Sequence, residues 1–325
     1  IIIITVLLLI SCERKNDILG PSLNDIYGEF DIIEKLDIIN RNVDFENSQN
    51  VYFTAEFSKT VNWQIKIKGN ISGAEKIING NSRIINENNS LWDGSTTNLP
   101  FFKIEDCNVE LFIPSDSLFF YDNNLTILST KVFDGLIVAD FENGLNPNWI
   151  PFVQAGTNMS FNIINDNAPE GNSYYDMGGD VDWDWLIGMI DFPASAYGQN
   201  TFNLNDNPDQ VYFNLLLYLP ENLINPPLVL FQFKEDDNLD NEFTPGIEDM
   251  YSIELREFKL GWQIISIKYS DLLTLSNGAP VEPDGDGIMN PDKLNMISML
   301  FLAQQGAGYS QVYVDYLIFT EIQPL

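Results

Sequence analysis

Apolar and polar residues alternate along most of this chain, with the period of two that places successive side chains on opposite faces of a β-strand. In residues 61–67 (VNWQIKI) every second residue is apolar, and Trp63 lies on the apolar face. Similar runs occupy 51–57 and 109–113. Asn, Asp, Gly and Pro separate the runs roughly every eight to twelve residues, which is the turn spacing of β-sandwiches. We therefore predict an all-β protein.

The character of the sequence changes near residue 132, and a chain of 325 residues has room for two domains with separate cores. Before this point the apolar runs are short and evenly spaced. After it the loops lengthen, acidic clusters appear, and four of the six tryptophans are found. We predict an N-terminal Ig-like β-sandwich over 28–132, which acts as a spacer, and a larger jelly-roll β-sandwich over 133–325.

One stretch of the second half, 176–192 (DMGGDVDWDWLIGMIDF), combines acidic residues, aromatic residues and a continuous apolar run. As a strand it places Trp183 and Trp185 on one face and Asp182 and Asp184 on the other, and both faces become apolar after Trp185. This pattern is typical of a strand that begins at a solvated rim and continues between two packed sheets. We expect the binding site of the protein to lie near this rim.

The composition excludes several classes of function. A formal net charge of −31 repels polyphosphates, so the sequence indicates that nucleic acid is not a partner. The chain contains no histidine, which removes Ser-His-Asp and Cys-His triads and nearly all catalytic zinc sites. Chemistry on this chain therefore relies on carboxylates, hydroxyls, amides, aromatic rings and hard cations.

The first residues carry a targeting signal. The apolar run that precedes Ser11 is too short to span a bilayer and has the length of a signal-peptide core. Leu9-Ile10-Ser11-Cys12 resembles a bacterial lipobox, which implies a signal segment over 1–12, a lipidated Cys12 and a polar tether over 13–27. An ordinary apolar strand or a plain secretory signal stays open as the alternative. With Cys12 acylated, we expect Cys107 to be a buried free thiol.

Aromatic rings mixed with short polar side chains suggest a carbohydrate ligand, because sugars stack their C–H faces on rings and hydrogen-bond through their hydroxyls. Such a mixture is present in the first part of the second domain, and the alternative is that these rings fill the sandwich core. The candidate ligand-binding residues are Trp149, Tyr174, Tyr175, Asp182, Trp183, Asp184 and Trp185.

Three segments of the second domain resemble carbohydrate-binding modules of the galactose-binding-like jelly-roll type. They are 138–144 (VADFENG), 168–175 (APEGNSYY) and 312–319 (VYVDYLIF). In the first domain, Trp92-Asp93-Gly94 resembles the corner of Ig-like modules of bacterial surface proteins. Together with the lipobox, the whole chain resembles surface glycan-binding lipoproteins of Bacteroidota. This implies non-catalytic glycan binding, a lipid anchor in the outer membrane, exposure to the cell exterior and membership of an outer-membrane uptake complex.

Asp315 interrupts a row of large apolar residues on the predicted last strand, where an ionised carboxylate is costly unless it is paired or bound to a metal. Calcium is a suitable partner because it prefers oxygen ligands. Hydrogen bonds from backbone amides are the alternative. In the modules that this domain resembles, a structural calcium joins the first and last strands, which implies Asp140, Glu142, Glu170 and Asp315 as its ligands here.

Of two other acidic stretches, 234–249 lacks the Gly and Glu positions of a calcium loop, and the Gly-rich turn 282–287 has no ligand set after it. We expect solvated loops at both. Two other functions stay open. A glycoside hydrolase or lyase can work with paired carboxylates alone, although the sequence has no tight motif of that kind. A structural or adhesion protein would bind protein partners instead.

Overall fold

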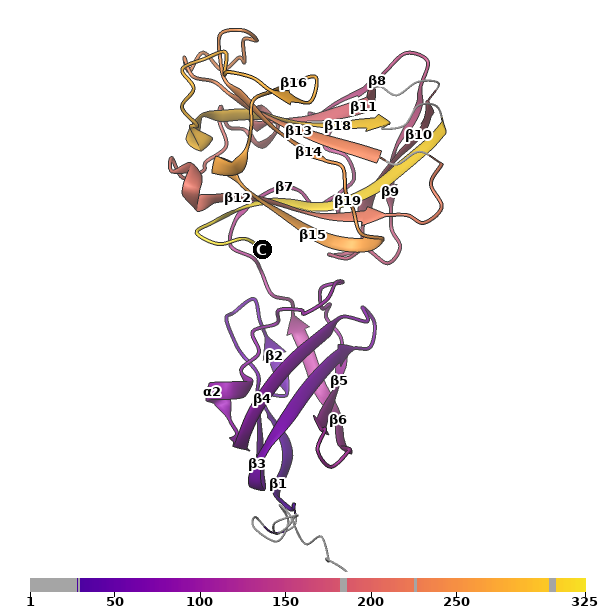
Figure 1. Cartoon of the computed structure of the whole chain (residues 1–325), viewed down its shortest axis with the longest axis vertical. Helices are drawn as coiled ribbons and strands as arrows, with labels where there is room; N and C mark the ends of the chain where they lie inside the picture. The colour runs from indigo at the N-terminus through magenta and orange to yellow at the C-terminus, as the bar shows by residue number, and fades with distance from the viewer. Residues whose placement is uncertain (1–27, 29, 182–185, 225–226, 304–307) are drawn as a thin grey trace, which may run out of the picture.

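The computed structural model describes residue 28 and residues 30–181, 186–224, 227–303 and 308–325, and in them nearly all regular structure is β. Figure 1 shows a small N-terminal β-domain joined to a larger sandwich of two sheets. The predicted all-β class is confirmed. No helix in the described part of the chain is long and apolar enough to cross a membrane.

The N-terminal domain is built from one curled sheet. Its strands are β1 (Ile32–Ile39), β2 (Asn42–Asp44), β3 (Tyr52–Gly69), β4 (Glu75–Ile85), β5 (Asp106–Ile113) and β6 (Leu118–Ser129), with a single helical turn, α2 (Glu87–Ser90). The order is β1-β3-β5-β6-β2, with β4 also paired to β3. The long β3 pairs with β1 through its first half and with β5 through its second half, so that one sheet encloses a core.

That core contains the residues that the alternation selected. Trp63, Ile65 and Ile67 are buried, while the residues between them, Gln64 and Lys66, are not. Trp92 is fully buried between the rings of Phe45 and Phe102. The spacer role and the Ig-like type of this domain stay predictions.

The C-terminal domain is a sandwich of two antiparallel sheets. One sheet, here called the β12/β19 sheet, has the order β15-β12-β19-β10-β9 with β7 beside β19, and the other, the β13/β18 sheet, has the order β14-β13-β18-β11-β8. The strands of the first are β7 (Leu136–Ala139), β9 (Asn158–Ile164), β10 (Tyr174–Val181), β12 (Val211–Leu219), β15 (Gly261–Lys268) and β19 (Gly308–Glu321). The strands of the second are β8 (Ile150–Val153), β11 (Leu186–Pro193), β13 (Pro227–Glu235), β14 (Met250–Leu255) and β18 (Leu294–Ala303).

Apart from the hairpins β9–β10 and β13–β14, successive strands of the two sheets alternate between them, which is the arrangement of a jelly roll. Aromatic side chains fill the space between them, and the Phe213 ring contacts those of Phe231, Phe233 and Phe319 at centroid distances of 5.0 to 5.2 Å. Each such ring contributes about 1.5 to 3 kcal/mol through burial. Because every second residue points inward, the residues between them form two outer faces.

The stretch 176–192 is not one strand, and that expectation is wrong. Residues up to Val181 belong to β10 and residues from Leu186 belong to β11, in different sheets. The cause is pairing, because the apolar run of β11 forms ladders with β8 and β18 while β10 pairs with β9 and β19.

The two domains meet at a small contact below the β12/β19 sheet (Figure 1). The Phe101 amide donates to the Pro169 carbonyl at 2.8 Å. Leu216, Tyr316 and Ile318 of the sandwich form an apolar cluster that Phe101 and its neighbours join.

Candidate functional site

Two of the predicted sugar-binding rings lie in the core, and their prediction is wrong. Trp149 is 8% exposed, its indole N–H donates to the Tyr197 hydroxyl at 3.0 Å, and its ring packs on those of Phe141 and Phe192. Tyr175 is fully buried at an inward position of β10. Neither ring is free to stack on a sugar, because the inner faces of both sheets need large apolar groups to fill the sandwich.

Tyr174, one residue before Tyr175, points outward from the β12/β19 sheet and is half-buried. Asp182, Trp183, Asp184 and Trp185 lie outside the described residues. In sequence they directly precede β11, a strand of the β13/β18 sheet.

A row of polar residues crosses the outer face of the β13/β18 sheet. Ser252 on β14 pairs with Gln232 on β13, Gln232 pairs with Ser298 on β18, and Ser298 pairs with Asp191 on β11. We call this row of four residues the polar trough. It spans three inter-strand spacings, or about 14 Å.

Longer side chains border the trough on both sides. The row next to it carries Met250, Lys234 and Met296, and the row beyond the other side carries Glu254, Leu230, Leu300 and Met189. Two of the four residues of the row, Ser252 and Ser298, have shorter side chains than the residues of the bordering rows and are almost fully buried.

Several oxygens at this face have no hydrogen-bond partner within the described structure. They are Asp191 Oδ1, Ser252 Oγ, Ser298 Oγ and Asn295 Oδ1, four of the seven such buried side-chain atoms in the described residues. An unpaired buried polar group costs about 1 to 3 kcal/mol. Ser252 and Ser298 are 1% and 0% exposed, so a ligand can reach their hydroxyls only if the bordering side chains move.

A cavity of about 500 Å³ adjoins the trough at the ends of β11, β13 and β18. Its walls include Gln199, Asn200, Lys234, Phe243 and Asn295. The cavity therefore offers amides, one ammonium group and one aromatic ring.

Lys234 is the cation of this cavity. Its Nζ lies 4.0 Å from Asp191 Oδ1, too far for a hydrogen bond, and 3.5 Å from Met296 Sδ, with the Phe243 ring centroid at 6.0 Å. Burial lowers the pKa of Lys234, and the charge of Asp191 opposes this effect. The ammonium group thus has N–H donors that no oxygen among the described residues engages closely.

The acidic loop after β13 forms one wall of the cavity. Residues 238–242 and 245–247 are exposed, as expected for a solvated loop, but some of its carboxylates are buried. Asp236 and Glu248 are each 1% exposed. Asp236 accepts from the Asn241 amide at 2.8 Å, and Glu248 accepts from the Thr244 amide at 2.6 Å. These carboxylates hold the loop in shape by binding its own backbone, which local sequence spacing does not reveal.

Three carboxylates beyond this wall, those of Asp237, Asp249 and Asp286, bring an oxygen each within 4.8 Å of one another. Asp249 accepts from the amides of Gly285 and Gly287, and Lys293 Nζ lies 3.3 Å from Asp237. Asp286 is exposed, as expected for 282–287. The cluster thus has backbone and lysine partners of its own.

The four predicted calcium ligands gather at the side of the sandwich next to the domain contact. Asp315 on β19 is fully buried and accepts from the amides of Tyr316 at 2.8 Å and Glu170 at 3.3 Å. Glu142 accepts from the amides of Asn172 and Ser173 at 2.6 and 2.7 Å. The backbone bonds considered as the alternative for Asp315 are therefore present.

Electrostatics shows that these carboxyl groups are close to one another. Burial raises the pKa of Asp315 to about 9, and the charge of Glu170 adds to the rise. Burial raises the pKa of Glu170 to about 7, and the charges of Glu142 and Asp140 add to it, while Lys103 of the N-terminal domain lowers it. Carboxyl groups that raise one another's pKa values have the donor chemistry that a hard cation prefers. In the structure, however, no three of these four carboxylates bring their oxygens within 4.8 Å of one another.

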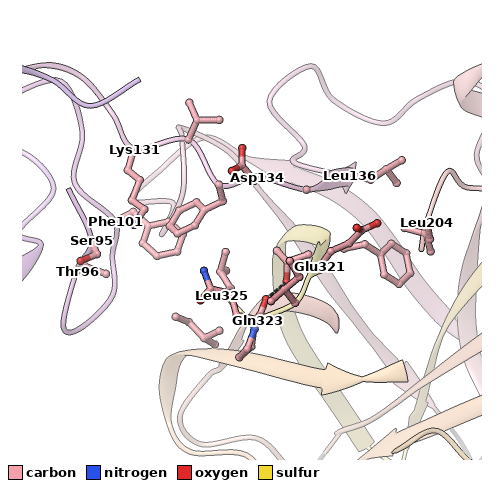
Figure 2. Close-up of a pocket in the computed structure, with 18 of the residues that line it drawn as sticks. Ser95, Thr96, Phe101, Lys131, Asp134, Leu136, Leu204, Glu321, Gln323 and Leu325 are labelled. Atoms are coloured by element: carbon pink, nitrogen blue, oxygen red, sulfur yellow. Dashed lines mark hydrogen bonds between the residues drawn. The ribbon is translucent and has the colours of Figure 1, made fainter. Parts of the chain in front are cut away.

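A second cavity, of about 1080 Å³, lies between the domains. Figure 2 shows Phe101, Lys131 and Asp134 on one side and Glu321 and Gln323 on the other. Lys131 already forms an ion pair with Asp93. Among the predicted ligand-binding and metal-binding residues that the structure describes, none lines this cavity.

The trough and Lys234 were missed by sequence reasoning. Residues 230–235 (LFQFKE) do alternate, and this pattern places Gln232 and Lys234 together on the face opposite the buried phenylalanines. The missing information was the register, which sets this pair beside Asp191 and Ser298.

Solved structures with a similar arrangement include several carbohydrate-binding proteins. One, reported for the promiscuous specificity of carbohydrate-binding modules of the β-sandwich superfamily, has a TM-score of 0.40 and 10% identity over 91% of this chain and 99% of that one. The family 11 module of the cellulase Lic26A-Cel5E of Clostridium thermocellum has a TM-score of 0.39 and 13% identity over 59% of this chain and 96% of that one. SGBP-B, from a xyloglucan utilization locus in Bacteroides uniformis, has a TM-score of 0.35 and 11% identity over 84% of this chain and 69% of that one.

No protein-family model matches the sequence, and no curated protein matches it. The structural similarities are too low to assign a role to any residue.

Glu235, at the base of the acidic loop, gives a prediction about pH. It is fully buried and accepts from the Tyr269 hydroxyl at 2.8 Å, and burial raises its pKa to about 8. The folded state therefore holds a proton that the unfolded state releases, so this group's contribution to stability falls as pH rises from about 4.5 through about 8.

In Glu235→Gln this loss of stability is absent, and thermal melts should show the Tm of the variant rising relative to that of the unmodified protein across that pH range. The exposed Glu282→Gln is the control, and an unchanging Tm difference for Glu235→Gln would contradict the assignment.

Proposed function

We propose that this chain is a non-catalytic carbohydrate-binding protein whose C-terminal sandwich holds a saccharide in the polar trough and the adjoining cavity. The observation that carries the proposal is the incompletely engaged ammonium of Lys234, which lines the cavity together with the amide of Asn295. A sugar hydroxyl both donates and accepts, so one ligand can satisfy donors and acceptors together.

The dimensions and chemistry of the site agree with this ligand. A cavity of 500 Å³ falls within the usual range for small-ligand sites. Lys234 would donate to a hydroxyl, Asp191 and Asn295 would accept from hydroxyls, and Phe243 offers an apolar ring wall. The predicted rim residues Trp183 and Trp185 come immediately before β11 in the chain, and they stay candidates for further stacking.

Binding fits this face better than hydrolysis does. Glycoside hydrolases need two carboxyl groups on either side of the scissile bond. Asp191 is the one carboxylate in the row of four, and Glu254 in the bordering row forms an ion pair with Arg256 at 2.6 Å. Glu242 also lines the cavity, but it is exposed on the acidic loop. The paired-carboxylate alternative predicts release of reducing ends from polysaccharides, whereas our proposal predicts none in a reducing-sugar assay.

The decisive variant is Lys234→Met, which keeps the length of the side chain and removes the ammonium. Loss of hydrogen bonds from a charged group should weaken binding about tenfold or more.

Xyloglucan, β-1,3-1,4-mixed-linked glucan and xylan are suitable first probes, in affinity electrophoresis and calorimetry. Lys268→Met is the matched control, because Lys268 forms an exposed ion pair with Asp209 on the other sheet. Equal effects of the two variants would contradict the site, and a blank result with a broad glycan panel would favour a protein-binding role.

We also propose that calcium binds at Asp140, Glu142, Glu170 and Asp315. The fit rests on hard oxygen donors, on the burial of Asp315 and on the mutual repulsion of these carboxyl groups. A bound cation would neutralise this repulsion and connect the segment after β7 with β19.

Calcium should therefore stabilise the fold. At saturation the melting temperature should rise by roughly 5 to 10 °C over the value in chelator. Asp315→Asn should remove most of this rise, whereas Asp286→Asn, in the other acidic cluster, should leave it in place. If Asp286→Asn removed the calcium-dependent rise in melting temperature and Asp315→Asn kept it, the cation would lie in the other acidic cluster, and this proposal would be contradicted.

Finally, we propose that Cys12 is acylated and that the protein is anchored in the outer membrane, facing the cell exterior, as part of a glycan-uptake complex. The support is the sequence Leu9-Ile10-Ser11-Cys12 behind its apolar run. Cys12→Ser should move the protein from the membrane fraction to the soluble fraction and abolish labelling by a fatty-acid analogue. Protease added to intact cells should digest the native protein, and full protection would contradict outward display.

A further inference from the structure

The sheet opposite the trough carries a group of aromatic side chains on its own outer face. Tyr174, Tyr218, Trp262 and Tyr313 come from β10, β12, β15 and β19, which are four neighbouring strands. All four side chains are half-buried. We call these four residues the aromatic face.

Strand register brings the four rings together. Tyr218 pairs directly with Trp262 on one side and with Tyr313 on the other. The rings of Tyr218 and Tyr313 are stacked, with centroids 5.2 Å apart and planes within 10°. The ring centroid of Tyr174 lies 5.0 Å from that of Tyr313 and 5.4 Å from that of Trp262. The result is a continuous aromatic surface across the sheet.

Hydrogen-bonding groups adjoin these rings. Asp176 on β10 pairs with Tyr313, and its Oδ1 accepts from Gln311 Nε2 at 2.8 Å. The Tyr309 hydroxyl lies over Gly178, where a Cβ would be only 3.0 Å from it, so the glycine makes room for this ring beside Asp176. A carboxylate, an amide and a fifth ring therefore extend the surface along β10 and β19.

The aromatic face does not belong to either of the cores around it. The sandwich core contains Tyr175 and Val314, the inward neighbours of Tyr174 and Tyr313, and none of the four rings. Trp262 also touches the apolar cluster at the domain contact, but the three tyrosines are outside that cluster. Packing within the molecule thus leaves the role of the tyrosine rings unexplained.

We propose that the aromatic face is a second saccharide-binding site, for a sugar chain that presents a flat C–H face. The rings would stack on that face while Asp176, Gln311 and the tyrosine hydroxyls bond to hydroxyl groups. The combination of three tyrosines, a tryptophan and an Asp–Gln pair favours a sugar over an aliphatic protein surface. Because the two sites lie on opposite outer faces of the sandwich and share no residue, either can fail without the other.

This arrangement makes the domain bivalent. A short oligosaccharide cannot reach both faces, since the sandwich with its packed core separates them. A protein molecule with both sites occupied would therefore hold two oligosaccharides, and a long polysaccharide could connect several protein molecules.

The test uses Tyr313→Ala, alone and combined with Lys234→Met, with circular dichroism and thermal melts to confirm folding. Tyr218→Ala, on the neighbouring strand, repeats the test if Tyr313→Ala fails to fold. Calorimetry with oligosaccharides of xyloglucan, mixed-linked glucan and xylan gives stoichiometry and affinity.

We expect Lys234→Met to keep one binding site, and we expect the addition of Tyr313→Ala to weaken binding at that site about tenfold. Tryptophan fluorescence gives an independent readout of the same site. Titration of Lys234→Met with these oligosaccharides should change its fluorescence, and the change should be absent when Trp262→Phe is added to that variant.

The outcomes separate the two proposals. Loss of all binding in Lys234→Met, with Tyr313→Ala unchanged, overturns the aromatic site and leaves the trough. Unchanged binding in Lys234→Met, with loss in Tyr313→Ala, supports the aromatic site and overturns the trough. No binding of any probe by the unmodified protein overturns both.

Discussion

The packing of two antiparallel sheets against each other, over a core rich in phenylalanine, is the interaction on which the C-terminal domain depends. It fixes the inward residues of every strand, such as Phe213, Phe231 and Phe319. Since side chains alternate, it also fixes which residues reach the two outer faces. The trough and the aromatic face are therefore consequences of core packing, because their residues are the outward partners of core residues.

Sequence reasoning succeeded where one strand carries the whole signal. The alternation around Trp63 gave the correct buried face of β3, and short runs with frequent turns gave the all-β class. It failed at Trp149 and Tyr175 because alternation shows which residues share a face but does not show which face is inside. Tyr174 and Tyr175 illustrate the point, since adjacent tyrosines with equal propensity lie on opposite sides of β10.

The candidate site could be predicted only in part for a related reason. In the local sequence, Lys234 is one outward position in the alternation of β13. Only the register between β13, β18 and β11 places it near Asp191. Register depends on contacts between distant residues, and no local pattern records them. The buried carboxylates of the acidic loop were missed because their partners are backbone amides, and any sequence supplies these.

The strong negative charge shapes the structure throughout. With 16 basic residues against 47 acidic ones, ion pairs cannot balance most carboxylates. Asp236, Glu248 and Asp249 instead bind backbone amides inside the fold, which lets loops of acidic composition form the walls of a cavity. In such surroundings Lys234 is exceptional because its ammonium lies 4.0 Å from Asp191, and this incomplete engagement gives the trough its polarity.

The central claim is that a saccharide occupies the polar trough. It is tested most directly by a crystal structure of the protein with a bound oligosaccharide at saturating concentration. Our account predicts sugar hydroxyls within hydrogen-bond distance of Lys234 Nζ and Asp191, with the sugar chain running across β11, β18 and β13. A saccharide bound elsewhere on the molecule, with the trough free of ligand, would contradict it.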